Sequence, residues 1–259
     1  MGYYGPKEIT KQFSASGIHK SSLSIPKFAI IAILGGAFIA FGGLLSVIVA
    51  GGMPGIGENN PGLIKFIAGA LFPIGLIMVS ITGADLFTSD CAAFTIPLLQ
   101  KIIKVGTFAK FIILSYIFNF FGTQIIAYFL ANSTHLFDNN PWCDYLFHYT
   151  ESKVYQDWGT VFIKGIGANW LVCLGMFMGY AAKDIFSKCI AIWIPIMLFV
   201  TLGYEHSIAN MFFVPAAIYA GANIPWVDFI VNNLIPSTLG NFAGGAFFVG
   251  CVYWYLHVK

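Results

Sequence analysis

Two short polar segments interrupt long apolar stretches of the chain, and they carry the side chains best suited to bind a small ion. The segments are G-A-D-L-F-T at 83–88 and G-Y-E-H at 203–206. An imidazole can exchange a proton or hydrogen-bond a solute, and a threonine hydroxyl can donate or accept a hydrogen bond. We therefore expect His206 and Thr88 to contact a bound solute. Thr88 can also cap a helix that begins near Ser89.

The acidic residues of these segments have a different expected role. A helix that restarts after a break leaves backbone N–H groups unsatisfied, and its dipole favours negative charge at that end. We expect Asp85 and Glu205 to accept hydrogen bonds from those N–H groups, with direct contact to a solute as the alternative. Asp90, in the first turn after the first break, is interpreted in the same way. The residues expected to support the breaks are Gly83, Asp85, Gly203 and Tyr204.

The composition shows that the solvent of most of this chain is lipid. Of 259 residues, 58% are hydrophobic and only 9% are charged, whereas soluble proteins carry roughly 25% charged residues. The 13 basic residues are all lysine and are balanced by 11 acidic residues, which excludes a basic face for nucleic acid. The cysteines show no metal-ligand spacing, so we expect neither a metal nor a cofactor.

Apolar runs long enough to cross a bilayer define the elements that must position these residues. They lie at 28–50, 63–83, 107–131, 159–181, 186–203 and 229–255. Shorter apolar stretches, 89–99 and 207–219, directly follow the second and fifth runs, so we expect those two helices to be broken at the polar segments. Matching breaks in two three-span halves are typical of inverted repeats with a transport site at mid-membrane. The sequence predicts an all-α membrane protein of six spans.

The distribution of lysine predicts the orientation in the membrane. Ten lysines lie in segments 1–27, 99–110, 182–188 and the C-terminal tail, against three on the opposite side. Because lysine is enriched in cytoplasmic loops, both termini are expected in the cytoplasm. Residues 1–27 are polar and lack a signal-peptide core. We expect them to form a cytoplasmic segment with a short surface helix, and residues 28–259 to form the six-span channel domain.

Three segments in this order resemble the signature motifs of the formate/nitrite transporter family. They are G-A-D-L-F-T-S at 83–89, A-N-W-L-V-C at 168–173 and G-Y-E-H-S-I-A-N-M-F at 203–212. The resemblance implies an aquaporin-like bundle with an inverted repeat, assembled as a homopentamer with one pore per protomer in the cell membrane. It also implies passage of small monovalent anions or their neutral acids, such as formate, nitrite, hydrosulfide, acetate or lactate.

The resemblance also implies roles for particular residues. The positions that match pore or substrate-contacting residues are His206, Thr88, Asn169, Glu205, Asn210 and Lys153. Lys153 is expected at the outer end of the fourth helix. The positions that match two apolar constrictions are Phe72, Leu76, Leu86, Phe87, Val172 and Phe199. The A-D-L-F-T-S form is most similar to the formate branch associated with formate dehydrogenase. Tyr204, where formate channels often have phenylalanine, adds a hydroxyl near His206 and leaves the choice of anion open.

Two transport mechanisms and two other protein classes remain open at this stage. An anion could take up a proton and cross as a neutral acid, because losing water makes a carboxylate a better base. It could instead stay charged beside a protonated His206. A haem-bearing membrane subunit of an enzyme usually needs paired axial histidines, and only His206 is expected at membrane depth. An aquaporin-type channel for neutral solutes would carry paired N-P-A motifs, which the chain lacks.

Overall fold

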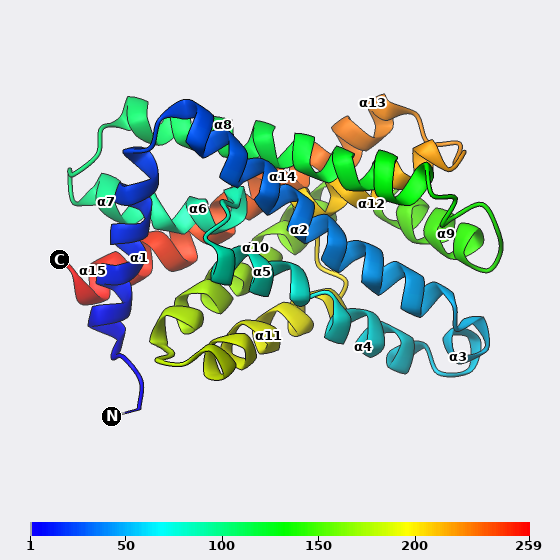
Figure 1. Ribbon diagram of the computed structural model, residues 1–259, viewed down its shortest axis with the longest axis horizontal. Coiled ribbons are helices and arrows are strands. Elements are labelled where there is room, and N and C mark those ends of the chain that lie inside the picture. Colours follow the sequence, from blue (N-terminus) through cyan, green and yellow to red (C-terminus); the bar gives the residue numbers. More distant parts are fainter. Residues whose placement is uncertain (1) are drawn as a thin grey trace.

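The chain folds entirely into helices and connecting turns over residues 2–259, which the computed structural model describes (Figure 1). The first half contains α1 (Pro6–Ser21), α2 (Ile25–Gly51), α3 (Pro54–Asn59), α4 (Pro61–Leu71), α5 (Ile74–Thr82), α6 (Phe87–Ala93), α7 (Thr95–Leu99), α8 (Val105–Gln124) and η1 (Ile125–Asn132). The second half contains α9 (Trp142–Val154), α10 (Trp158–Ala181), α11 (Ile185–Thr201), α12 (Ser207–Tyr219), α13 (Trp226–Asp228), η2 (Phe229–Leu234), α14 (Ile235–Gly245), η3 (Ala246–Cys251) and α15 (Val252–His257).

Five helical stretches are long and apolar enough to cross a membrane. They are Ile25–Gly51, Pro61–Thr82, Val105–Asn132, Trp158–Ala181 and Trp226–His257. The remaining predicted span is α11, a helix of 17 residues, which is close to the shortest length that crosses a bilayer. The predicted half-helices are also present, as Phe87–Leu99 and Ser207–Tyr219. The all-α, six-span fold with two broken helices is confirmed.

The two breaks have the same backbone geometry. α5 is capped by Gly83 with φ of 76°, and α11 is followed, after its C-cap Leu202, by Gly203 with φ of 70°. This left-handed conformation is easily adopted only by glycine, so each glycine stops its helix and turns the chain into an extended segment. The chain then restarts as α6 and α12. The repeat in the sequence is therefore a repeat in the structure.

Long helices in each half pack closely in pairs, α2 along α8 and α10 along α14. Two glycines permit the approach. A Cβ atom at Gly122 would collide with the carbonyl oxygen of Ile33, and one at Gly240 with that of Phe162. Small residues at such contacts allow helix backbones to meet within a membrane. Each half of the chain therefore contains one closely packed helix pair beside its broken helix.

Besides the short α3, two helices of residues 2–259 lie outside the six spans and the two half-helices. α1 crosses one end of the molecule, where both termini lie (Figure 1), and packs against α6, α7, α8, α10 and α15. Its Phe13 is buried against the rings of Phe177 and Tyr180. At the other end, α9 occupies the connection between the third and fourth spans. Its Leu146, Thr150, Lys153 and Val154 form one buried helical face.

Candidate functional site

Two asparagines, one from each half, hold the broken helices in place. Asn119 of α8 accepts a hydrogen bond from the backbone N–H of Phe87 at 2.8 Å and donates to the carbonyls of Ala32 and Asp85 at 2.7 and 3.0 Å. Asn241 of α14 repeats the pattern, accepting from the N–H of Ser207 at 2.7 Å and donating to Gly165 and Glu205 at 2.8 Å each. The unwound backbone is thereby satisfied by protein, as burial in a membrane requires.

The acidic residues do not cap the half-helices as expected. Among residues 2–259, no backbone N–H donates to the carboxylate of Asp85 or Glu205, because the asparagine amides occupy those donors. Asp85 accepts from Ser115 Oγ at 2.6 Å and lies 2.7 Å from Lys20 Nζ. Glu205 instead contacts a lysine and several amides. Each acid is therefore part of a polar cluster beside its break.

His206 and Thr88 join the two breaks at the centre of the molecule. His206 Nε2 and Thr88 Oγ1 lie 3.1 Å apart, and both side chains are buried. His206 is also the N-cap of α12, since its Nδ1 accepts from the N–H of Ala209 at 3.0 Å. A nitrogen that accepts carries no hydrogen, so the pattern assigns the hydrogen of the neutral imidazole to Nε2, which then donates to Thr88. The ring of Phe199 stacks on His206 with centroids 5.7 Å apart.

A buried ion pair lies next to His206. Lys153 Nζ is 3.2 Å from both carboxylate oxygens of Glu205, and both residues are almost fully buried. Asn210 and Asn233 donate to Glu205 Oε2 at 2.8 and 3.2 Å, and Gln156 donates to Oε1 at 3.2 Å. The expected position of Lys153 on the fourth span is wrong, because it lies on α9.

The polar centre is separated from two larger cavities by apolar side chains. A void of only about 10 Å³ is lined by residues that include Phe72, Lys153, Phe199, Tyr204, His206 and Asn210. Tyr149 and Val200 also line a cavity of about 650 Å³ beside α9, which we call the α9-side cavity. A second cavity of about 490 Å³, the α1-side cavity, is lined by Lys20, Val79, Gly83 and Met176 among others.

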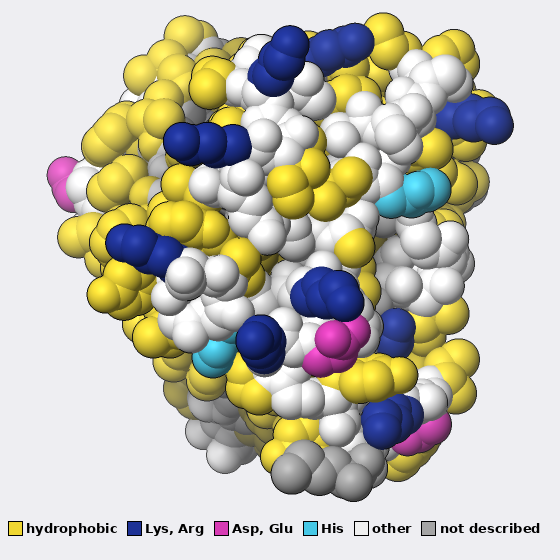
Figure 2. All heavy atoms as spheres, turned by 90° about the vertical axis from the view of Figure 1, so that its left-hand side faces the viewer, with side chains coloured by type: hydrophobic (Ala, Val, Ile, Leu, Met, Phe, Trp, Pro, Cys, Tyr) yellow, Lys and Arg dark blue, Asp and Glu magenta, His cyan; other side chains and the backbone are white. Residues whose placement is uncertain are grey.

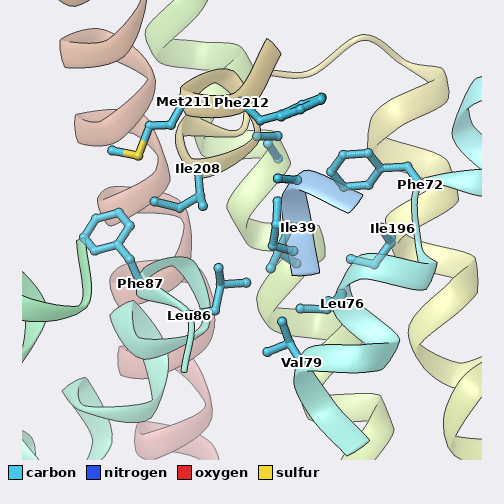
Figure 3. Close-up of a cluster of buried hydrophobic side chains, with 14 of the residues drawn as sticks. Ile39, Phe72, Leu76, Val79, Leu86, Phe87, Ile196, Ile208, Met211 and Phe212 are labelled. Atoms are coloured by element: carbon cyan, nitrogen blue, oxygen red, sulfur yellow. The ribbon is translucent and has the colours of Figure 1, made fainter. Parts of the chain in front are cut away.

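Of the six residues predicted to form the two apolar constrictions, five are buried in two groups, and the ring of the sixth, Phe87, lies elsewhere. Phe72 and Phe199 form an edge-to-face pair with centroids 5.9 Å apart, and both line the small central void. Figure 3 shows Leu76 of α5 and Leu86 of the first break extending toward the same space, and both are fully buried. Val172 is buried on α10. The ring of Phe87 points away and packs on Tyr116 of α8, with centroids 4.9 Å apart.

Asn169 was expected to contact the solute in the pore, but its side-chain amide binds backbone carbonyls instead. Its amide donates to the carbonyls of Thr88 and Asn241 at 3.0 and 2.6 Å. It therefore ties the first break to α14, directly behind Thr88. Sequence reasoning missed Asn119, Asn241 and Lys20. The two asparagines are polar residues within apolar runs of the third span of each half, which is a usable signal, whereas nothing near Lys20 distinguishes it from other lysines of the first segment.

Two broken helices that meet at a buried polar pair between two cavities are typical of a membrane channel or transporter. Residues 2–259 contain no group of three or more His, Cys, Asp or Glu side chains that could hold a metal. The model of the formate/nitrite transporter family matches residues 7–255. The chain therefore belongs to this family, and it is a multi-pass membrane protein.

Relatives and solved structures agree with this assignment. A probable formate transporter of Methanothermobacter thermautotrophicus is 38% identical over 271 residues, covering 99% of this chain and 98% of the relative. A solved pentameric formate channel with formate bound has a TM-score of 0.78 and 31% identity, covering 91% of this chain and 98% of its own. An ion channel of the same family has a TM-score of 0.88 at 25% identity, covering 96% and 98%.

Proposed function

We propose that the chain is a channel that moves formate together with a proton, with formic acid crossing the centre as a neutral molecule. The geometry of His206 is the observation that carries the proposal. Because Nδ1 accepts from the N–H of Ala209, a second ring hydrogen would place two donors against each other. The structure thus favours a neutral imidazole, which supplies a hydrogen-bond donor and no counter-ion for a bare anion.

The physics of the apolar barriers supports passage of a neutral acid. Moving a carboxylate-sized ion into a medium of low dielectric constant costs several kcal/mol even after relaxation, out of an idealised ~20 kcal/mol. As formate enters the constriction at Phe72 and Phe199 it loses water, which makes it a better base. It then takes up a proton from the external solution that reaches it through the α9-side cavity, so that one formate and one proton cross together. His206 Nε2–H and the Thr88 hydroxyl offer hydrogen bonds at the narrowest point.

Other site residues have supporting roles in this proposal. Lys153 attracts the anion toward the centre, while Glu205, Asn210 and Asn169 hold the lysine and the two breaks in position. Leu76, Leu86 and Val172 form the second apolar barrier, with Phe87 packed behind it. The substrate class is supported by the relatives described as a formate transporter and a formate channel.

We further propose a homopentamer in the cell membrane with both termini in the cytoplasm. The solved pentameric channel supports the assembly. Lysine side chains gather on the end of the molecule that carries α1 and the termini (Figure 2), as cytoplasmic faces do. In this orientation the α9-side cavity opens outward and the α1-side cavity opens to the cytoplasm. Residues 1–27 form the cytoplasmic segment and residues 28–259 the channel domain.

Uptake of radiolabelled formate into proteoliposomes tests the function. With the membrane potential clamped, we expect saturable uptake that rises as external pH falls. The rate of uptake should not depend on the membrane potential. Uptake that scales with voltage would refute neutral passage, and uptake no greater than in empty liposomes would refute the formate assignment.

The alternative substrate is a different small monovalent anion, and the position of Tyr204 supports this alternative. Tyr204 lines the small central void, and its hydroxyl has no hydrogen-bond partner within residues 2–259, so it is available to a solute that accepts hydrogen bonds. Competition by nitrite, hydrosulfide and lactate in the same vesicles ranks the substrates. A competitor that is itself taken up faster than formate would replace it in the proposal.

A further inference from the structure

A cluster beside the first break contains two carboxylates but one ammonium group. Lys20 Nζ of α1 lies 2.7 Å from Asp85 Oδ1 and 2.6 Å from Asp90 Oδ1. Both carboxylate side chains are fully buried, and the lysine side chain is 12% exposed. If all three groups were ionised, the protein would hold an uncompensated negative charge in its interior.

No other contact within residues 2–259 balances this negative charge. Both carboxylates direct their ion pairs to Lys20, and the other side chain that donates to them is the neutral hydroxyl of Ser115. Asp90 Oδ2 is buried without any hydrogen-bond partner, and Asp85 Oδ1 has no hydrogen-bond donor of suitable geometry. An isolated buried charge is strongly unfavourable, and a buried carboxylate commonly avoids it by taking up a proton.

The two carboxylates are also neighbours, because one oxygen of each contacts the same lysine nitrogen. Like charges held this close cannot both be ionised without a large penalty. A single proton between them supplies the missing donor and leaves one negative charge, which Lys20 balances.

We propose that Asp85 and Asp90 share one proton and form, with Lys20, a neutral proton-binding site at the first helix break. The site differs from the His206 centre, which lies at the second break. It does not depend on which solute the protein carries, because it follows from the charges and contacts of the cluster alone.

The proton of this site can exchange with water through the α1-side cavity. Lys20, Gly83 and Ala84 line that cavity next to Asp85. Other titratable groups that line the cavity or lie against Asp90 are His19, Lys27, Tyr180, Cys91 and Cys173. None of them forms an ion pair with either carboxylate within residues 2–259, so the proton count of the cluster is set by its own three members.

Infrared spectroscopy of the purified full-length protein in lipid counts the proton directly. A protonated carboxyl group gives a C=O stretching band that shifts on transfer to D₂O, and an ionised carboxylate does not. The wild type is expected to show this band at neutral pH with the intensity of one carboxyl group. Asp90→Asn and Asp85→Asn should each abolish it, because a single carboxylate remains, fully balanced by Lys20.

Removing the lysine gives the opposite expectation. In Lys20→Met both carboxylates lose their counter-ion, so both become protonated and the band should grow about twofold. Lys20→Met combined with Asp90→Asn should restore the wild-type intensity. Glu205→Gln is the matched control: Glu205 is equally buried but paired one-to-one with Lys153, so its loss should leave the band unchanged.

A wild-type protein without the band, or a band that persists in both aspartate variants, would overturn the proposal. If one variant fails to fold, the remaining variants still give a distinct proton count. The spectrum does not require transport, so failure of the proton site and failure of the formate assignment are read from separate experiments.

Discussion

At the scale of single residues, the contacts of His206 fix what its ring can do. One nitrogen caps α12 and the other faces Thr88. These two contacts fix the orientation of the ring. In the proposed mechanism, His206 Nε2 exchanges the hydroxyl of Thr88 for formic acid. The functional prediction of the sequence, that these two side chains act together, thus has a geometry that makes it testable.

Replacing Thr88 by valine keeps the shape of the side chain and removes its hydroxyl. Formate uptake is expected to fall about 3- to 10-fold, the loss of one hydrogen bond worth ~1 kcal/mol in the transition state. Thr95→Val is the matched control, since that hydroxyl bonds only the carbonyl of Cys91 in its own half-helix. Equal effects of the two substitutions would show that the Thr88 hydroxyl has no special role.

The ion pair of Lys153 and Glu205 predicts strong coupling between two single substitutions. Lys153→Met and Glu205→Gln should each lower the free energy of unfolding by about 3–5 kcal/mol, because each leaves one buried charge without its partner. The double variant leaves no charge and should lose much less than the sum. Thermal unfolding in detergent measures all three proteins. Additive losses would contradict a direct pair.

At the scale of elements, the breaks depend on side chains supplied by other helices. Asn119→Ala should leave the N–H of Phe87 and the carbonyl of Asp85 unsatisfied, and should remove a second hydrogen bond from the helical carbonyl of Ala32. We expect a loss of about 1–3 kcal/mol for each buried group left without a partner, and the same for Asn241→Ala. Asn59→Ala, which affects an exposed bond to Gly55, is the control in a thermal unfolding series. An unchanged melting temperature for both buried variants would exclude this capping role.

A second element-scale prediction concerns the start of α11. The N–H of Ser187 donates to Asp184 Oδ1 at 2.9 Å, which lowers the pKa of this exposed carboxyl from 3.8. A group with a lowered folded-state pKa stabilises the protein above its unfolded value, and that stabilisation disappears as pH falls through the folded value. The wild type should therefore be more stable than Asp184→Ala at pH 7, and the difference should shrink below about pH 4. A difference that is independent of pH would rule out the charged cap.

The elements could be predicted better than the contacts between them. Apolar runs and the paired Gly83 and Gly203 locate the spans and breaks, because membrane helices need length and hydrophobicity and because left-handed backbone needs glycine. The sequence could not show which side chains satisfy the breaks. Asp85 and Glu205 are adjacent in sequence to the free N–H groups, yet asparagines from distant helices bind those groups and leave the acids to lysines.

The same limit explains the incorrect placement of Lys153. Its helix, α9, is too polar to be recognised as a membrane element, and its burial arises only when α12, α2 and η2 enclose it. Lys20 was missed for a similar reason. Its partners Asp85 and Asp90 lie far along the chain, so only the packing of α1 across the end of the bundle brings the three together.

At the scale of the whole molecule, the two halves of the chain and the connection between them build the centre together. Thr88 reaches His206 across the repeat, and Lys153 reaches Glu205 from the connection between the halves. Large apolar side chains such as Ile30, Ile113 and Phe129 remain exposed on the outside of the protomer, where lipid or neighbouring subunits cover them. In the homopentamer proposed above, each chain would form its own pathway, and the protomers would transport independently.

This independence makes a quantitative prediction for mixed assemblies. Oligomers formed from wild-type chains and chains carrying Thr88→Val with His206→Ala, purified through tags on each kind, should transport formate in direct proportion to the fraction of wild-type chains. The reason is that an inactive protomer contributes nothing to its neighbour's centre. Assemblies of wild-type chains alone, carrying either tag, serve as the reference. A decline that is much steeper than proportional would mean that protomers act together, and would place an essential part of the pathway between the chains.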